Sequence, residues 1–215
     1  MKKCCILTAR DPRSLYGGDI QRLETLVTNL QEKFVVTVVV TGGRRKKISS
    51  SKANTIFDQI NVVYVSNNFL MMLFGVFWSF LSFNTIQNGL YGNAFVKYQI
   101  NKILRGNVFD LLVFHLFRNY MVFDQKAVPC QHIDLCDAQS RTYTDLLSSL
   151  PNVSLKRFIF EYELAKTIRI ESAILRSNNH SVSVINDADR CFLAHRYHCK
   201  SKLLVLPNNI YFDLK

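Results

Sequence analysis

The feature that most constrains the fold is a series of short apolar runs separated by segments of helical length. In the clearest run, Phe34-Val35-Val36-Thr37-Val38-Val39-Val40, neither alternating face is polar. Continuous β-branched runs of this kind are typical of strands that are buried on both faces, as in a parallel sheet covered by helices. The runs are Cys4–Thr8, Phe34–Thr41, Asn61–Val65, Asp110–Phe114, Val128–Asp134, Val182–Ile185 and Lys202–Leu206. The sequence therefore predicts an α/β fold with a Rossmann-like, mostly parallel sheet flanked by helices.

A glycine pair, Gly17-Gly18, lies between the first strand and the first helix. The helix is indicated by an apolar face at helical spacing, formed by Ile20, Leu23, Leu26, Val27 and Leu30. Glycines let backbone amides approach a ligand closely, and a helix N-terminus favours phosphate or another anion. Strand-to-helix turns also use glycine for ordinary geometric reasons, so the pair alone leaves both interpretations open.

Composition bounds the environment of the chain. With 215 residues, 48% of them hydrophobic, it can bury one substantial core, and its net charge of +11 predicts attraction to polyanions. The N-terminal Met1-Lys2-Lys3 lacks a signal-peptide core, and the six cysteines are not densely spaced, which indicates free thiols in a reducing cytoplasm. A zinc site has one weak candidate set, whose spacing is not a standard pattern: Cys191, His195, His198 and Cys199.

Two adjoining segments suggest a surface for membranes. The connector after the second strand contains Arg44-Arg45-Lys46-Lys47, which is either a solvated loop or a contact for anionic headgroups. Every residue from Gln59 to Val96 is uncharged, and the run Phe69–Phe83, with Phe77 and Trp78, is apolar nearly all round. The run is shorter than the roughly 20 residues of a spanning helix. Shallow insertion into one leaflet, a core helix or partner interface, and a true span remain as alternatives.

Polar residues follow two strands in the second half of the chain. The segments are Asp134-Leu135-Cys136-Asp137-Ala138-Gln139-Ser140 and Asn186-Asp187-Ala188-Asp189, each at the end of an apolar run and before a helix. An α/β sheet presents its ligand contacts at that position. Asn186 or Asp187 would equally serve as an ordinary helix N-cap.

Taken in order, these motifs resemble the N-terminal half of a GT-B glycosyltransferase of the family 4 type, and the resemblance covers nearly the whole chain. It is carried by Gly17-Gly18 with Arg22, Phe109-Asp110-Leu111-Leu112-Val113-Phe114-His115, the Asp134–Ser140 segment, Glu161-Tyr162-Glu163, and Val182-Ser183 with Asp187 and Asp189. The resemblance implies a domain at residues 1–207, the start of an interdomain linker at 208–215, and a donor-binding C-terminal domain that these residues do not include.

Roles for individual residues follow from the same resemblance. It implies that Gly17, Gly18 and Arg22 lie near the donor diphosphate, and that His115 contacts the donor sugar. The alternative for His115 is a histidine whose hydrogen bonds are satisfied at the end of a strand. Asp137 is the one carboxylate that we would test in catalysis, with a structural role at the strand end as the alternative. Arg118 would either face an acceptor phosphate or be solvated at the edge of the domain. Glu163 and Glu171 match the spacing of the superfamily's carboxylate pair, but that pair belongs to the missing domain, and surface pairing on a helix from Ser154 to about Arg176 is the expected explanation.

The predicted function is acceptor binding in a retaining glycosyltransferase that moves sugar from a nucleotide-sugar to a lipid-linked or polysaccharide acceptor. No metal or separate cofactor is implied, and the chain is not expected to be active without a donor-binding domain in cis or in trans. The expected location is cytoplasmic, peripheral on the inner face of the cell membrane, whose anionic surface is the expected partner. The alternative is a non-catalytic membrane-surface subunit that recruits a separate donor domain, whereas a nucleic-acid ligand is disfavoured because aromatic residues are not interleaved with Arg and Lys.

Overall fold

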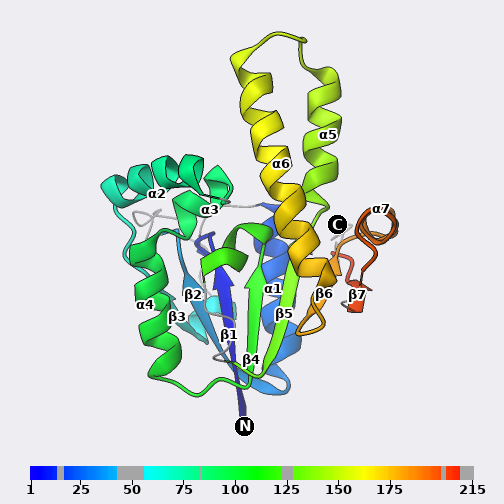
Figure 1. Cartoon of the computed structure of the whole chain (residues 1–215). Helices are drawn as coiled ribbons and strands as arrows, with labels where there is room; N and C mark the ends of the chain where they lie inside the picture. The colour runs from blue at the N-terminus through cyan, green and yellow to red at the C-terminus, as the bar shows by residue number, and fades with distance from the viewer. Residues whose placement is uncertain (14–16, 43–55, 83, 123–127, 200–201, 209–215) are drawn as a thin grey trace, which may run out of the picture.

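The predicted fold is confirmed: a seven-stranded, all-parallel sheet is flanked by helices (Figure 1). The computed structural model describes residues 1–13, 17–42, 56–82, 84–122, 128–199 and 202–208. The strand order is β3-β2-β1-β4-β5-β6-β7. The strands are β1 (Lys2–Thr8), β2 (Phe34–Val40), β3 (Asn61–Tyr64), β4 (Leu111–His115), β5 (Cys130–Cys136), β6 (Ser181–Val184) and β7 (Lys202–Val205).

Helices cover both faces of the sheet, and the strands alternate between two apolar cores. On β1, Cys4 and Ile6 pack with Leu23 and Val27 of α1, whereas Cys5 and Leu7 belong to the core on the other face. That second core includes residues from α4, α6 and α7. The helices are α1 (Gly18–Gln31), α2 (Phe69–Leu81), α3 (Ile86–Tyr91), α4 (Ala94–Arg105), α5 (Gln139–Ser149), α6 (Leu155–Arg176) and α7 (Asp187–Tyr197), with 3₁₀ turns η1 (Ile56–Asp58) and η2 (Phe117–Val122). Burial on both faces explains why strand sequences lack a polar face.

Figure 1 shows α2 and α3 above the carboxyl ends of the strands, and α5 and α6 as a hairpin that projects beyond the sheet. Asn67, just before α2, bonds to the end of β2 and to α3. Its Nδ2 donates to Thr41 O at 3.2 Å and to Leu90 O at 3.0 Å. Side-chain oxygens of the N-cap residues accept backbone amides at five helices, and these residues are Asn68, Thr85, Asn93, Ser154 and Asn186. The N-cap interpretation of Asn186 is therefore confirmed.

The expected surface pairing of Glu163 and Glu171 is wrong, because both side chains are buried. Glu171 Oε1 accepts Ser140 N at 3.0 Å and Glu163 Oε1 accepts Ile86 N at 2.8 Å. These amides lie at the N-termini of α5 and α3, where the first four amides of a helix have no partner within it. The two glutamates of α6 thus satisfy the starts of two neighbouring helices.

The same helix also binds the C-terminal end of α2. Lys166 Nζ donates to the carbonyls of Ser79 and Ser82, and Tyr162 Oη donates to Phe80 O at 2.9 Å. A cation and a hydroxyl at a helix C-terminus satisfy free carbonyls and interact favourably with the helix dipole. Helix α6 therefore fixes the position of α2 over the edge of the sheet.

Candidate functional site

The carboxyl edge of the sheet between β1 and β4 is the candidate site, because the strand order reverses direction there. Parallel α/β sheets bind ligands in the crevice at such a switch point. Helix α1 begins at Gly18, beside this crevice, and the backbone oxygen of Asp19 in its first turn lies 3.0 Å from His115 Nε2 at the end of β4. The structure thus brings the predicted glycine pair and the predicted histidine to one place.

The start of α1 already has charged side chains of its own. Gly17 is the N-cap, and its carbonyl accepts Ile20 N at 3.0 Å. Asp19 forms an ion pair with Arg10, with 2.8 Å between Oδ2 and Nε. A Cβ on Gly17 would lie 2.6 Å from Asp19 Oδ1, whereas a Cβ on Gly18 would meet nothing within 4 Å. A side chain at position 17 would therefore displace the Asp19 carboxylate, while position 18 is open.

Arg22 and His115 meet in the interior, where both bind the carboxylate of Asp134. Arg22 is 3% exposed, and His115 and Asp134 are 0% exposed. Arg22 Nε donates to Asp134 Oδ2 at 2.7 Å, and His115 Nδ1 lies 3.0 Å from the same oxygen. Burial alone would raise the pKa of Asp134, but hydrogen bonds from His115 and Arg22 outweigh it and hold that pKa well below its ordinary value.

Both ring nitrogens of His115 have partners within the protein. Nδ1 lies 3.0 Å from Asp134 Oδ2, and Nε2 lies 3.0 Å from Asp19 O. The ring therefore presents no nitrogen to a ligand.

Arg22 also reaches the end of the described chain. Its Nη1 donates to Leu206 O and to Asn208 Oδ1, the latter at 3.2 Å. Residues 209–215 of the expected linker lie outside the described residues. The contacts of Arg22 thus join α1, β5 and the segment after β7, which is a structural role at the edge of the candidate cleft.

His115, Asp134 and Cys136 are the one group of three possible metal ligands in the described parts of the chain. The group is poorly suited to a cation, because the guanidinium of Arg22 already binds Asp134. Burial also raises the pKa of the Cys136 thiol well above its ordinary value, which disfavours the thiolate that binds metals. The cluster is therefore better explained as an internal ion-pair network.

The weak zinc candidate on and after α7 gains no support. The four side chains do not form a group of possible ligands within the described residues, and three of them are exposed. The four are Cys191, His195, His198 and Cys199.

Asp137 is the predicted site residue that the structure places at the surface of this edge. It follows Cys136, whose φ of 64° is in the left-handed region, so the backbone turns sharply at the end of β5. Partial burial, followed by the negative charge of Asp189, raises the pKa of Asp137. A carboxyl group with a raised pKa at the end of a parallel strand is a candidate for acid–base chemistry.

The remaining predicted residues are dispersed. Arg118 is half-buried, with its guanidinium carbon 5.6 Å from the centre of the Tyr91 ring on α3, beside the same edge. Asp110 lies at the start of β4, at the opposite edge from His115, where its carboxylate accepts Lys3 N at 2.7 Å. The basic residues Arg44, Arg45, Lys46 and Lys47 lie outside the described residues.

Helix α2 exposes almost its entire apolar surface. Only Gly75 and Ser79 are buried, whereas Phe77 is 63% and Trp78 is 55% exposed. The large exposed side chains are Phe69, Leu70, Met71, Leu73, Phe74, Phe77, Trp78, Phe80 and Leu81. The structure thus contradicts a core helix. Among the described residues, no helix is long and apolar enough to cross a membrane, so a span finds no support either.

Sequence reasoning identified Asp134 only as part of a motif and did not select it as a site residue. Its available signal was an acidic residue inside a strand that was expected to be buried on both faces, since a buried carboxylate needs a partner.

A scan against protein-family models finds no match to this chain, and a search of curated proteins likewise finds no similar protein.

Proposed function

We propose that the chain is the acceptor-binding domain of a retaining GT-B glycosyltransferase similar to family 4. It would act at the inner face of the cell membrane and help to move sugar from a nucleotide-sugar to a lipid-linked or polysaccharide acceptor. The observation that carries the proposal is the exposed apolar helix α2 above the carboxyl edge of a Rossmann-like sheet. A lipid-linked acceptor must be met at the membrane surface, and large exposed apolar patches mark such interaction surfaces.

Several features of the sheet edge are consistent with this role. Gly17 and Gly18 lie at the switch point, where one wall of a donor cleft would stand, and Asp137 lies at the end of β5 on the same edge. Arg22 and His115 act in this proposal as positioning residues, because their bonds to Asp134 hold α1, β4 and β5 together. The nucleotide would be held by a donor-binding domain in cis or in trans.

The membrane part of the proposal is tested by flotation with phosphatidylcholine vesicles that contain or lack an anionic lipid. Removing the Phe77 side chain should weaken binding. Full burial of a Phe contributes about 1.5–3 kcal/mol, and Phe77 is 63% exposed, so Phe77→Ser should lower partition roughly fivefold to thirtyfold. Val108→Ser is the control, because Val108 is 82% exposed but lies before β4, at the opposite edge of the sheet. Equal loss in both variants, or none in either, contradicts docking through α2.

The transfer reaction requires a separate measurement. With the donor-binding domain supplied, labelled nucleotide-sugars are offered to membranes that contain the acceptor, and incorporation of label into lipid or polysaccharide is followed. Asp137→Asn should lower incorporation while vesicle binding stays unchanged, because Asp137 is exposed and follows β5 rather than belonging to α2. Failure of every nucleotide-sugar to label an acceptor would refute the transferase role.

One observation favours a second candidate, a non-catalytic membrane-surface subunit. His115 and Arg22 are bonded within the interior and present no free group to a sugar or a diphosphate. This candidate predicts vesicle binding through α2 without any transfer activity that depends on Asp137.

A further inference from the structure

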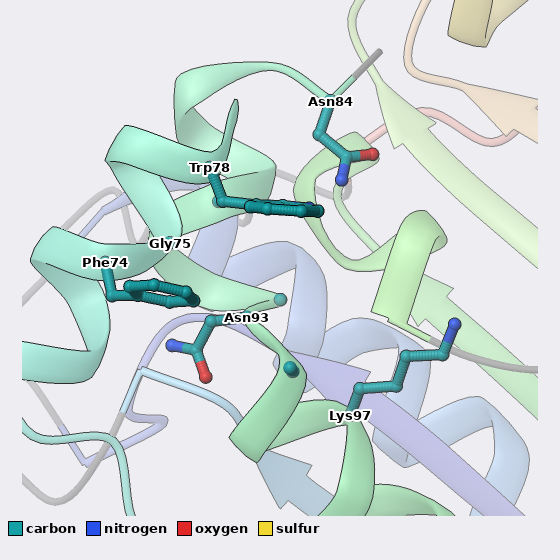
Figure 2. A pocket seen from close by; sticks show the side chains of 9 residues that line it. Phe74, Gly75, Trp78, Asn84, Asn93 and Lys97 are labelled. Carbon is teal, nitrogen blue, oxygen red and sulfur yellow. The ribbon is translucent and has the colours of Figure 1, made fainter. Parts of the chain in front are cut away.

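A pocket lies between α2, α3 and α4, on the face of α2 that adjoins the other two helices (Figure 2). Its volume is about 410 Å³, which is within the usual range for small-molecule sites. Three glycines, Gly75, Gly89 and Gly92, line the pocket. A Cβ on Gly75 would lie 2.1 Å from Gly89 O, and a Cβ on Gly89 would lie 2.3 Å from Gly75 O. The backbones of α2 and α3 therefore touch, and the larger side chains beside them border a hollow.

The lining of the pocket is amphipathic. Phe74 and Trp78 present nearly parallel rings, 16° apart with centroids separated by 6.4 Å, and Figure 2 shows both rings along the same side of α2. The polar groups come from Asn84, Asn93 and Lys97. Asn93 is already engaged, since it accepts Val96 N and donates to Asn67 Oδ1. Lys97 is thus the charged group of the pocket, at the first turns of α4.

The charge around the pocket has one sign. Residues 59–109 contain three basic side chains, Lys97, Lys102 and Arg105, and no acidic one. Within the described chain, no ion pair includes Lys97, and no acidic residue lines the pocket. A pocket lined by an exposed lysine and by two exposed aromatic rings suits a ligand with an anionic end and an apolar chain.

We infer that this pocket binds one anionic lipid, with its phosphate at Lys97 and its hydrocarbon chain along Phe74 and Trp78. This differs from adsorption to a bilayer, because it is a saturable site for a single molecule. It goes beyond the proposed function, because the pocket binds its ligand whether or not the chain takes part in sugar transfer.

Trp78 serves as an intrinsic fluorescence probe of binding, because it is the single tryptophan of the chain and lines the pocket. The experiment titrates the protein with dihexanoyl phosphatidic acid below its micelle concentration and follows the emission of Trp78. The expected result is a saturable shift to shorter wavelength with one lipid bound per protein. Dihexanoyl phosphatidylcholine, which is zwitterionic, should bind more weakly. Glycerol 3-phosphate, which lacks chains, should cause no shift. Equal affinity for phosphatidylcholine overturns the role of the anionic group, and binding of glycerol 3-phosphate as tight as that of the lipid overturns the role of the chain.

Two variants that each remove one positive charge from α4 distinguish binding in the pocket from a general effect of charge. Lys97→Gln should weaken phosphatidic acid about fivefold or more, and should leave phosphatidylcholine unchanged. Lys102→Gln makes the same charge change on α4 outside this pocket, and its effect should stay below about twofold. Equal effects of the two variants overturn the site.

Ala94→Leu fills the pocket from its own lining and should weaken the binding of both lipids. Unchanged binding overturns the placement of the hydrocarbon chain in this pocket. Because the assay uses neither vesicles nor sugar, its outcome is independent of the proposed function.

Discussion

Asp134→Asn removes the negative charge between Arg22 and His115 while leaving the side chain nearly the same size. Asp134 and His115 are fully buried and Arg22 is 3% exposed, so the guanidinium of Arg22, left without its carboxylate, has little access to water. Removing one partner of a buried pair costs about 3–5 kcal/mol, because it leaves an uncompensated charge inside the protein. We expect the free energy of unfolding to fall by that amount.

The assay is urea unfolding followed by far-UV circular dichroism. With a urea dependence of about 2–3 kcal/mol/M, the midpoint should fall by roughly 1–2.5 M. Asp137→Asn, three residues further along and exposed, is the matched control and should change stability by less than about 0.5 kcal/mol. A second comparison adds Arg22→Met to Asp134→Asn. Because the added change removes the uncompensated charge, the double variant should be little worse than the single one.

Asp134 should also make the stability of the protein depend on pH. The pKa of Asp134 is lowered by folding, so its contribution to stability is present above the ordinary pKa of 3.8 and is lost as pH falls below that value. Asp134→Asn should therefore flatten the acid limb of a stability profile. A loss of stability below about 1 kcal/mol, or additive costs in the double variant, would refute the buried ion-pair account.

Three further perturbations test separate contacts. Gly75→Ala places a Cβ 2.1 Å from the backbone oxygen of Gly89 and should lower the thermal midpoint by several degrees, whereas Gly18→Ala, with nothing within 4 Å, should change it little. Glu171→Gln weakens bonds to an amide of α5 and a hydroxyl of α7 and should cost about 1.5–3 kcal/mol in urea unfolding. Burial lowers the pKa of His132 from 6.5, so stability should fall as pH drops through that value, and His132→Gln should remove this slope from pH-dependent thermal melts.

The sheet was predictable because its signal is local. Each strand contributes a run without a polar face, and burial on both faces follows directly from that pattern. The cap at Asn186 was predictable for the same reason, since it depends on residues three positions apart.

The internal network and the role of α6 were not predictable, because their partners are distant in sequence. Arg22 and Asp134 are separated by 112 residues, and no periodicity connects them. Glu163 and Glu171 have basic neighbours on α6, which made surface pairing plausible. Their burial depends on where other helices begin, and only the packed structure supplies that information. The apolar run of α2 was compatible with a core helix or an interface. In the structure its buried residues are the small Gly75 and Ser79, so the large apolar side chains lie outside the core.

Helix α6 has a consequence for how this fold tolerates change in length. On α6, Lys166 binds the end of α2 and Glu163 binds the start of α3, and these two residues lie about one turn apart. Glu171, which binds the start of α5, lies about two turns after Glu163. An inserted residue between Glu163 and Glu171 would rotate the second part of the helix by about 100° relative to the first. One of the two sets of contacts would then be lost. The eight-residue spacing between these glutamates is thus under geometric constraint from the packing of three other helices.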